Sequence, residues 1–413
     1  MHFSDNLTDL SHGADRMPSP HQADTNQPPG FAWAFGMAAP GMQLFTTGLK
    51  QRAPAGPITT LGERTRRFFT GLQAAAPTAL LVGALPFDRA GDDFLFMPET
   101  VSDTAWPVAA RAQDPAPRWR ATPEPDRDAY AASVARALKA IAAARESGPT
   151  LTKAVLSRSV RLETDAEIDP LGLWLNLQVD STVTRFLTPV GIGVDGAMRR
   201  LVGATPELLV SRRGDRVVSH PLAGSARRNA DPAEDEAASR ALLASGKDRR
   251  EHAFVVEAIL DLLAPLCADL SAPGGPSLAS TRTMWHLGTR IEARLRAPEE
   301  TTAADLAALL HPTPAVAGTP RQAALDLIRD LESHDRGFYA GAVGWMNAGG
   351  DGDWHVALRC AEVEGRTVRA FAGAGIVEGS DPEAEADETS AKLLAILRAL
   401  GVNEQGRLAA GAG

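Results

Sequence analysis

The sequence predicts an α+β fold built on large, mostly antiparallel β-sheets. Strand-like runs occur in neighbouring pairs joined by short turns that contain glycine, a pattern typical of antiparallel hairpins. Amphipathic helical stretches interrupt these runs without the regular alternation of strand and helix that a parallel sheet needs. The chain has 413 residues, of which 44% are hydrophobic and 23% charged, so it holds enough apolar material for a sizeable core.

The first predicted elements lie before residue 220. A helix begins after Asp126, a good capping residue, and ends at Gly148, because apolar side chains recur along one stripe of it. A strand follows at residues 153–162. The segment LLVSRRGDRVVS then forms a hairpin that turns at Gly214.

The second half of the chain adds two helices and a longer run of strands. One helix spans about 247–266, and another begins with Thr319 as its N-cap and Pro320 as its first helical residue. Residues 339–377 form antiparallel hairpins, with turns at 349–353 and 364–365.

The chain ends are predicted to lie outside a single folded domain of residues 31–402. Residues 1–30 are polar and rich in proline, a composition that cannot offset the entropy of ordering, so we expect a flexible leader. Residues 403–413 form a flexible tail. The proline-rich stretch 103–125 reads as a long surface connection.

Charge and cysteine content exclude several classes of partner. The formal net charge of −9 argues against a nucleic acid or an anionic membrane, both of which attract clustered Lys and Arg. Cys267 and Cys360 lack metal-binding spacing and are expected to be buried and reduced. The N-terminus has no secretory signal pattern, which indicates a cytoplasmic protein.

The first of the two later helices carries an unusual carboxylate. Glu251 falls on the stripe that should face the core, together with Val255, Ala258 and Leu262, and a buried carboxylate is costly without a partner. Asp248 lies about 60° away around the helix, so the two acids can converge on a hard cation such as Mg²⁺. The alternative is that they only complement the helix dipole.

A second acidic pair occurs near the C-terminus. Glu385, Glu388 and Lys392 share a helix face that continues with Ala395 and Ala399. The simpler interpretation is a solvated face with one Glu–Lys pair. Two such acidic pairs on separate helices would form a four-carboxylate cage around one cation.

Small residues mark candidate anion sites. Gly224, Gly373 and Gly375 stand at the ends of strand-like runs, where a ligand could approach backbone N–H groups, although plain turn chemistry explains them equally well. Arg359 in HVALRC could bind a carboxylate through both nitrogens, or could face solvent from a strand.

Taken together, the stretch from Asp126 to about Leu400 resembles the chorismate-using enzymes. Ten short blocks carry this resemblance in order: KAVLSR, GATPELL, PLAGSARR, KDRREH, MWHLGT, HPTPAVAG, FYAGAVGW, ALRCAEV, FAGAGIV and EADETSAKL. It implies two large, mostly antiparallel β-sheets packed face to face, helices outside, and an active site in the cleft between the sheets. Residues 31–402 would then be one catalytic domain.

Within that family, several positions resemble the branch that makes isochorismate. Lys153 stands where ammonia-using members lack a lysine, which implies water as the nucleophile, and Ala223 replaces the nucleophilic lysine of the aminodeoxychorismate branch. Ala315 and Val316 stand where salicylate synthases tend to carry threonine, whereas Tyr339 is common in those enzymes. The resemblance therefore implies isomerisation of chorismate to isochorismate for siderophore or menaquinone biosynthesis, with salicylate synthase, which also eliminates pyruvate, as the alternative.

The resemblance also assigns two catalytic roles. Lys153 would deprotonate the water that adds at C2 of the ring, and Glu207 would protonate the C4 hydroxyl that leaves. At neutral pH this chemistry needs a partly neutral lysine and a partly protonated glutamate, which desolvation in a closed cleft favours.

Cofactor and substrate contacts follow from the same resemblance. Mg²⁺ would be held by Glu251 and Glu388, with Asp248 and Glu385 in support, and would bind the ring carboxylate of chorismate. The expected substrate-binding residues are Gly224, Ser225, His286, Ala315, Tyr339, Arg359, Gly373, Gly375 and Lys392. His286 could instead be a packed core histidine. We expect a monomer without a glutaminase subunit.

Overall fold

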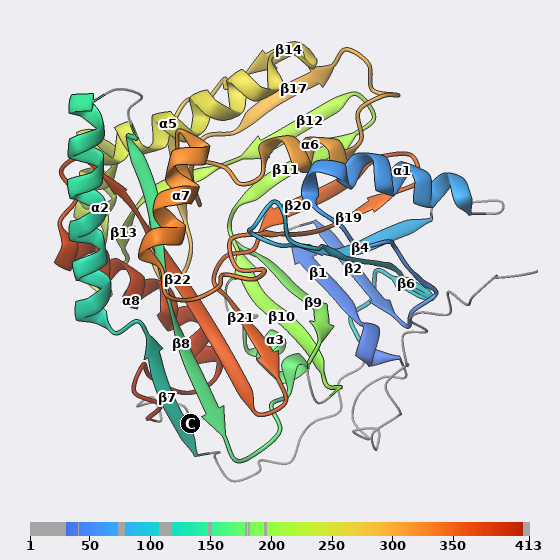
Figure 1. The fold of residues 1–413 in the computed structure, drawn as a ribbon, viewed down its shortest axis with the longest axis horizontal. Coiled ribbons are helices and arrows are strands. Elements are labelled where there is room, and N and C mark those ends of the chain that lie inside the picture. Colours follow the sequence, from blue (N-terminus) through green and yellow to red (C-terminus); the bar gives the residue numbers. More distant parts are fainter. Residues whose placement is uncertain are drawn as a thin grey trace, which may run out of the picture.

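Two large β-sheets and a small third one make up most of the structure, a computed structural model (Figure 1). It describes residues 30–39, 41–72, 79–106, 118–147, 151–177, 180, 182–193 and 196–407. The predicted leader, apart from Gly30, and residues 408–413 of the predicted tail lie outside these ranges.

The first large sheet combines strands from both ends of the chain. Its order is β18-β8-β22-β21-β10-β9-β1-β2-β6, and β7 pairs with β8. The strands are β1 (Phe35–Ala39), β2 (Met42–Thr47), β6 (Thr100–Ser102), β7 (Trp119–Glu124), β8 (Lys153–Thr164), β9 (Thr184–Ile192), β10 (Met198–Thr205), β18 (Gly318–Thr319), β21 (Cys360–Glu364) and β22 (Thr367–Val377).

The second large sheet has the order β14-β17-β12-β11-β20-β19-β4-β5-β3, and β13, β16 and β15 form the small sheet. Every strand pair among the described residues is antiparallel, as the sequence predicted. The bounds are β3 (Gln51–Arg52), β4 (Leu80–Leu85), β5 (Phe94–Met97), β11 (Leu208–Arg213), β12 (Arg216–His220), β13 (Leu222–Arg227), β14 (Cys267–Ser271), β15 (Ser277–Ser280), β16 (Met284–Gly288), β17 (Ile291–Leu295), β19 (Ala342–Asn347) and β20 (Gly352–Val356).

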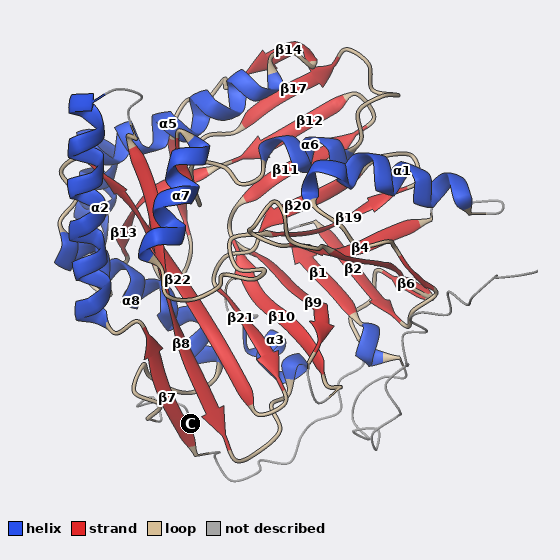
Figure 2. Ribbon diagram, viewed as in Figure 1, coloured by secondary structure: helices blue, strands red, loops and turns tan. Residues whose placement is uncertain are grey.

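Helices cover the outer sides of the two large sheets (Figure 2). Helix α8 packs on β22, and α2 packs on α8 and β8, whereas α6 packs on β11 and β20 and contacts α1. The helices are α1 (Leu61–Gly71), α2 (Arg127–Ser147), α3 (Pro170–Asn176), α4 (Pro232–Ala244), α5 (Gly246–Leu263), α6 (Ala303–Leu310), α7 (Arg321–Leu331) and α8 (Pro382–Ala399), with short 3-10 turns at Phe31–Trp33 and Ile58–Thr60.

Alternation along β9 shows how the first sheet separates two cores. Phe186 is fully buried among side chains from both large sheets, such as Val210 of β11. The next residue, Leu187, is buried on the opposite face, beside Trp174 of α3 and Leu393 of α8. Because successive strand residues point to opposite faces, one strand serves both the layer between the sheets and the layer under the helices. The predicted face-to-face α+β architecture is confirmed.

The predicted helices and hairpins are confirmed, with three corrections. Helix α7 begins at Arg321 with Pro320 as its N-cap, because Thr319 belongs to β18 and pairs with β8. The proline-rich connection contains a strand, β7, that the prolines concealed. Helix α5 ends at Leu263, because the chain turns there to enter β14.

Both cysteines are buried and free, as expected. Among the described residues, no helix combines the length and the apolar composition needed to cross a membrane.

The packing of β9 generates a stability prediction. Replacing Phe186 by Ala should lower the free energy of unfolding by about 3–5 kcal/mol, because it leaves a cavity between the sheets. Replacing the exposed Ile192 of the same strand by Ala should cost no more than about 0.5 kcal/mol. Urea unfolding measures both, and equal losses would contradict the proposed core.

Candidate active site

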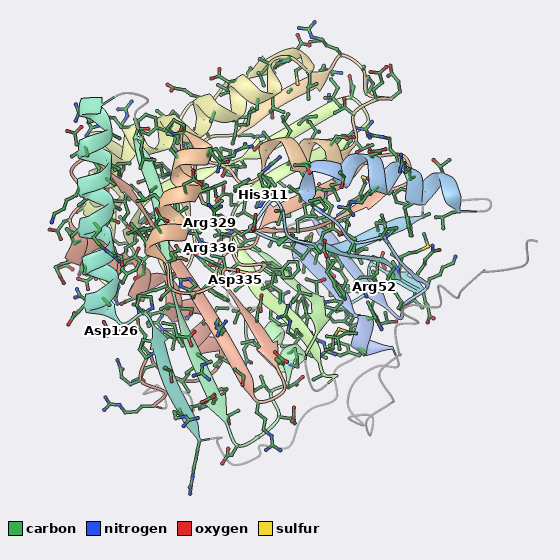
Figure 3. The ribbon with its side chains drawn as sticks, viewed as in Figure 1. Arg52, Asp126, His311, Arg329, Asp335 and Arg336 are labelled. Carbon is green, nitrogen blue, oxygen red and sulfur yellow. The ribbon has the colours of Figure 1, made fainter. Side chains whose placement is uncertain are left out.

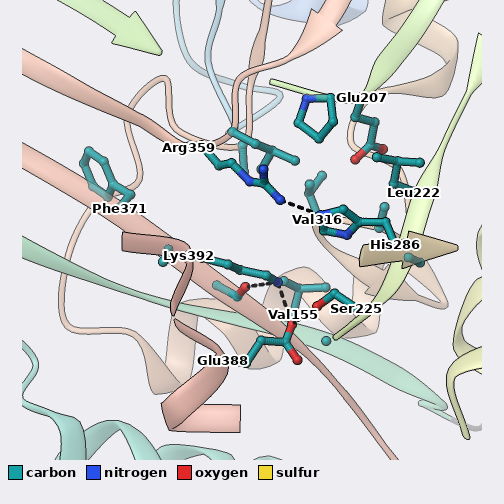
Figure 4. Close-up of a pocket in the computed structure, with 18 of the residues that line it drawn as sticks. Val155, Glu207, Leu222, Ser225, His286, Val316, Arg359, Phe371, Glu388 and Lys392 are labelled. Carbon is teal, nitrogen blue, oxygen red and sulfur yellow. Dashed lines mark hydrogen bonds and ion pairs between the residues drawn. The ribbon is translucent and has the colours of Figure 1, made fainter. Parts of the chain in front are cut away.

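One pocket gathers most of the residues predicted from the sequence (Figure 4). It lies where β22 of the first sheet, the β10–β11 junction and the small sheet meet α8. The predicted residues that line it are Glu207, Gly224, Ser225, Glu251, His286, Ala315, Tyr339, Arg359, Gly373, Gly375, Glu388 and Lys392. Lys153, Asp248 and Glu385 are not part of this lining.

Glu207 is a buried carboxylic acid that faces the pocket. It follows β10 directly, is 2% exposed, and its Oε1 has no hydrogen-bond partner among the described residues. Burial raises the pKa of Glu207 to about 8, although Lys153 and the backbone of Leu222 act in the opposite direction. The side chain is therefore mostly protonated at neutral pH, as expected for a proton donor.

Lys153 lies immediately behind the pocket wall, at the start of β8. Its side chain is fully buried and its Nζ is 3.0 Å from Oε1 of Glu251. A Cβ at Gly375 would lie only 2.1 Å from that same oxygen and 3.2 Å from Cε of Lys153. Glycine is thus required at position 375 because the ion pair packs directly against the strand backbone.

The acids of the two helices gather on one side of the pocket, each close to a lysine. Lys247 pairs with Glu385 at 2.6 Å, and Lys392 pairs with Glu388 at 2.7 Å. The lysines at 153 and 247 were not expected as partners of these acids, because sequence spacing shows pairs only within one helix. No group of three or more His, Cys, Asp or Glu side chains among the described residues is arranged as a metal site.

Burial, and secondly neighbouring charges, shift the pKa values of three of these acids. Burial, followed by Glu388, raises the pKa of Glu385, and burial raises the pKa of Asp248, with Glu251 and Glu388 adding to it. Burial alone would also raise the pKa of Glu388, but Lys392 and Ser225 outweigh it and hold this pKa below its ordinary value. Asp248, Glu385 and Glu388 therefore influence one another electrostatically, and their carboxylate oxygens are of the kind that a hard divalent cation prefers.

The buried stripe of α5 differs slightly from the predicted one. Glu251 and Val255 are buried as expected, but the stripe continues through Ile259 and Leu263 rather than Ala258 and Leu262. The prediction that a carboxylate lies on the core-facing side is nevertheless confirmed.

Arg359 and His286 form a second polar contact in the pocket. A guanidinium N–H of Arg359 donates to Nε2 of His286 (Figure 4). Burial, with Arg359 next, lowers the pKa of His286 well below its ordinary value, so the ring is neutral and accepts this bond. The sequence placed Arg359 on a strand, but it lies between β20 and β21 with a φ of 46°.

The predicted glycines line the pocket, but they do not lie at strand ends as expected. Gly373 and Gly375 lie inside β22, opposite Ser157 and Val155 of β8, rather than at a strand end. A Cβ at Gly373 would lie 2.9 Å from a backbone oxygen of Leu156, so the requirement is close packing. Gly224 lies within β13 at an irregular register with a φ of 79°, and Asp248 packs against it.

The remaining predicted residues are held by neighbours within the pocket. The Ser225 hydroxyl donates to Glu388 at 2.9 Å, and Lys392 Nζ donates to the carbonyl of Gly373 at 2.8 Å. Ala315 is half-buried in the loop before β18.

Phe371 and Arg336 are among the pocket residues that sequence reasoning missed. Phe371 stacks on Tyr339 with ring centroids 5.0 Å apart. Arg336 is buried beside them and donates to the carbonyls of Val155 and Val316 (Figure 3). An arginine after a helix usually lies in solvent, so the sequence held no signal for this burial; Phe371, however, opens the block FAGAGIV.

Known proteins share this fold and sequence. Residues 99–401 match the family model described as chorismate binding enzyme. The chain belongs to this family. Isochorismate synthase DhbC from Bacillus subtilis (strain 168) is 41% identical over 380 residues, which cover 90% of this chain and 94% of that protein.

Two solved structures extend the comparison. DhbC from Bacillus anthracis aligns with a TM-score of 0.83 and 38% identity, covering 90% of this chain and 97% of that one. MenF, the menaquinone-specific isochorismate synthase from Escherichia coli, aligns with a TM-score of 0.74 and 25% identity, covering 89% and 88% of the two chains. The resemblance stated from the sequence blocks is thereby confirmed.

The burial of Glu207 predicts a specific pH dependence of stability. Its folded pKa of about 8 exceeds the ordinary value of 4.5, so the folded state holds a proton that the unfolded state has lost between these values. Stability from this group is therefore lost as pH rises through that window. Glu207→Gln should exceed wild type in stability by a margin that grows from about pH 5 to about pH 9.

Thermal or urea unfolding of both proteins across this pH range checks the prediction. The exposed Glu299, replaced by Gln, is the matched control and should give a margin that does not vary with pH. A constant margin for Glu207→Gln would show that this carboxyl titrates normally in the folded protein.

Proposed function

We propose that this protein converts chorismate to isochorismate. The observation that carries the proposal is a protonated Glu207 that lines the pocket and a buried Lys153 directly behind the wall, which also presents Arg359 and Lys392. An acid and an amine are the two proton carriers that a hydroxyl exchange needs, and cationic side chains suit a dicarboxylate substrate. The names of the aligned relatives support the same reaction.

In this mechanism both groups act at stated atoms. Lys153 first gives the ammonium proton of its ion pair to Glu251. It then takes a proton from the water whose oxygen bonds to C2, and Glu207 gives its proton to the C4 hydroxyl oxygen as the C4–O bond breaks. Water is gained and lost, so the product is an isomer of the substrate. Arg359 and Lys392, with the backbone at Gly224 and Gly375, hold the enolpyruvyl carboxylate.

The remaining predicted contacts complete the substrate site in this proposal. His286 fixes Arg359 through their hydrogen bond, which favours a positioning role over a packed core histidine. Ser225, Ala315, Tyr339 and Gly373 contact the substrate.

We also propose Mg²⁺ as the cofactor. Glu251 and Glu388 line the pocket, and Asp248 and Glu385 support them from behind, so the donor set consists of carboxylate oxygens that repel one another. A bound cation would relieve that repulsion and supply a Lewis acid for the ring carboxylate.

The wider setting belongs to the same proposal. Residues 31–402 form one catalytic domain of a monomeric cytoplasmic enzyme. Lys153 and water as the nucleophile remove the need for a glutaminase subunit. The product supplies siderophore or menaquinone biosynthesis.

The reaction can be tested by following two products. With chorismate and Mg²⁺, the purified protein should form isochorismate without stoichiometric pyruvate, measured by chromatography and by a lactate dehydrogenase couple. A metal chelator should abolish turnover. Stoichiometric pyruvate in place of isochorismate would identify a salicylate synthase instead.

The proton carriers can be tested by substitution. Lys153→Ala and Glu207→Gln should each lower kcat by at least ~100-fold, the usual contribution of a general acid or base. Circular dichroism should show an unchanged fold, and Lys139→Ala, on the partly exposed side of α2, is the control for loss of a lysine. Wild-type turnover in either variant would remove that residue from the mechanism.

A further inference from the structure

A second cavity of about 470 Å³ adjoins the active-site pocket and shares Arg359 with it. Its walls come from the end of α3, the turn before β16, the end of β10 and the last turns of α8. No residue of this cavity other than Arg359 has a role in the proposed reaction.

Three elements run from the cavity into the pocket. On α8, Ala395 lines the cavity one turn after Lys392, which lines the pocket. Next to β16, Thr283 lines the cavity and His286, three residues later, lines the pocket. At the end of β10, Ala204 lines the cavity and Glu207, three residues later, lines the pocket. Each of these three elements therefore lines first one of the two spaces and then the other.

Small side chains keep the outer space open. Ala395 and Ala399 continue the face of α8 that carries Glu388 and Lys392, whereas the bulky Leu393 and Leu397 pack into the core on the other side. Ala204 adds a third small wall residue. The alanine face is thus the reason that α8 leaves room beyond Lys392.

The cavity is basic in a chain whose formal net charge is −9. Its wall carries Arg282, Arg359 and Arg398 against the single acid Asp180. Arg282 and Arg398 are exposed, so they meet the solvent side, whereas Arg359 is 8% exposed and reaches His286 in the pocket. The three guanidinium groups therefore extend from solvent to the active site.

Arg359 is held firmly at the junction. Its φ of 46° lies in the left-handed region that non-glycine residues rarely adopt, so the surrounding structure imposes this conformation. Its carbonyl accepts from the N–H of Ala204 at 3.2 Å, and its guanidinium donates to His286. A fixed cation at the border can contact a carboxylate from either side.

We propose that the cavity is an antechamber that binds the dicarboxylate substrate before it reaches the pocket. This inference rests on the proposed function. Arg282 and Arg398 attract one carboxylate from solvent, and Arg359 receives it as the ring moves inward along the alanine face of α8. A cleft whose walls carry mainly one sign of charge raises the association rate of oppositely charged ligands, and this effect weakens as the salt concentration rises.

Charge removal at the outer end tests the antechamber. Arg282→Gln with Arg398→Gln should lower kcat/KM for chorismate by about tenfold at an ionic strength of about 0.01 M, with kcat within about twofold of wild type. Raising the ionic strength to about 0.1 M should shrink the difference. Arg216→Gln with Arg290→Gln removes the same charge from a surface hollow over β12 and β17 and should have no effect.

Filling the cavity tests it independently of charge. Ala395→Phe should lower kcat/KM while leaving kcat unchanged, because the substrate passes more slowly but reacts normally. A loss of kcat in Ala395→Phe as large as its loss of kcat/KM would overturn the proposal. So would an Arg282/Arg398 double variant whose kcat/KM and salt dependence equal those of the Arg216/Arg290 control.

Calorimetric titration with chorismate separates this proposal from the proposed function. If wild-type protein binds chorismate but forms no isochorismate, the proposed function fails. In that case the antechamber proposal still predicts that the Arg282/Arg398 double variant binds chorismate about tenfold more weakly than wild type at low salt. An unchanged Kd would contradict the antechamber proposal.

Discussion

The buried ion pair between Lys153 and Glu251 is the interaction on which the rest of the site depends. Its lysine is fully buried, and its carboxylate comes from a helix that is distant in the chain. A charge without a partner at this depth would destabilise the fold, so the pair requires α5 to pack against the start of β8. Gly375 lies against this pair, and a Cβ there would overlap the Glu251 carboxylate.

Charge balance explains how several acids share one wall. Lys153, Lys247 and Lys392 each contact one carboxylate; the first two pairs join β8 to α5 and α5 to α8, and the third lies within α8. Glu207 is different, because its nearest charges are too few to offset its desolvation and it remains protonated instead. Burial favours the neutral form of every acid here, and Lys392 holds the pKa of Glu388 below its ordinary value whereas no such partner does so for Glu207.

Backbone contacts set the shape that these charges occupy. Arg336 links the carbonyl of Val155, two residues after Lys153, to that of Val316 in the loop before β18. Tyr339 and Phe371 stack beside this link. These contacts join the loop before β18 to β8 close to Lys153, on the side of the aromatic pair that lines the pocket.

The sequence by itself determined the main hairpins, the helices that carry the site, and the residue types of the site. Local periodicity reveals these because each depends on neighbours within a few residues, as with Glu251 on the buried side of α5. Only the tertiary structure decided that Lys153 meets Glu251, that Lys247 meets Glu385, and that Gly373 and Gly375 serve packing inside a strand. Those contacts join segments more than 90 residues apart in the chain, and no local pattern records which distant backbone will approach a given side chain.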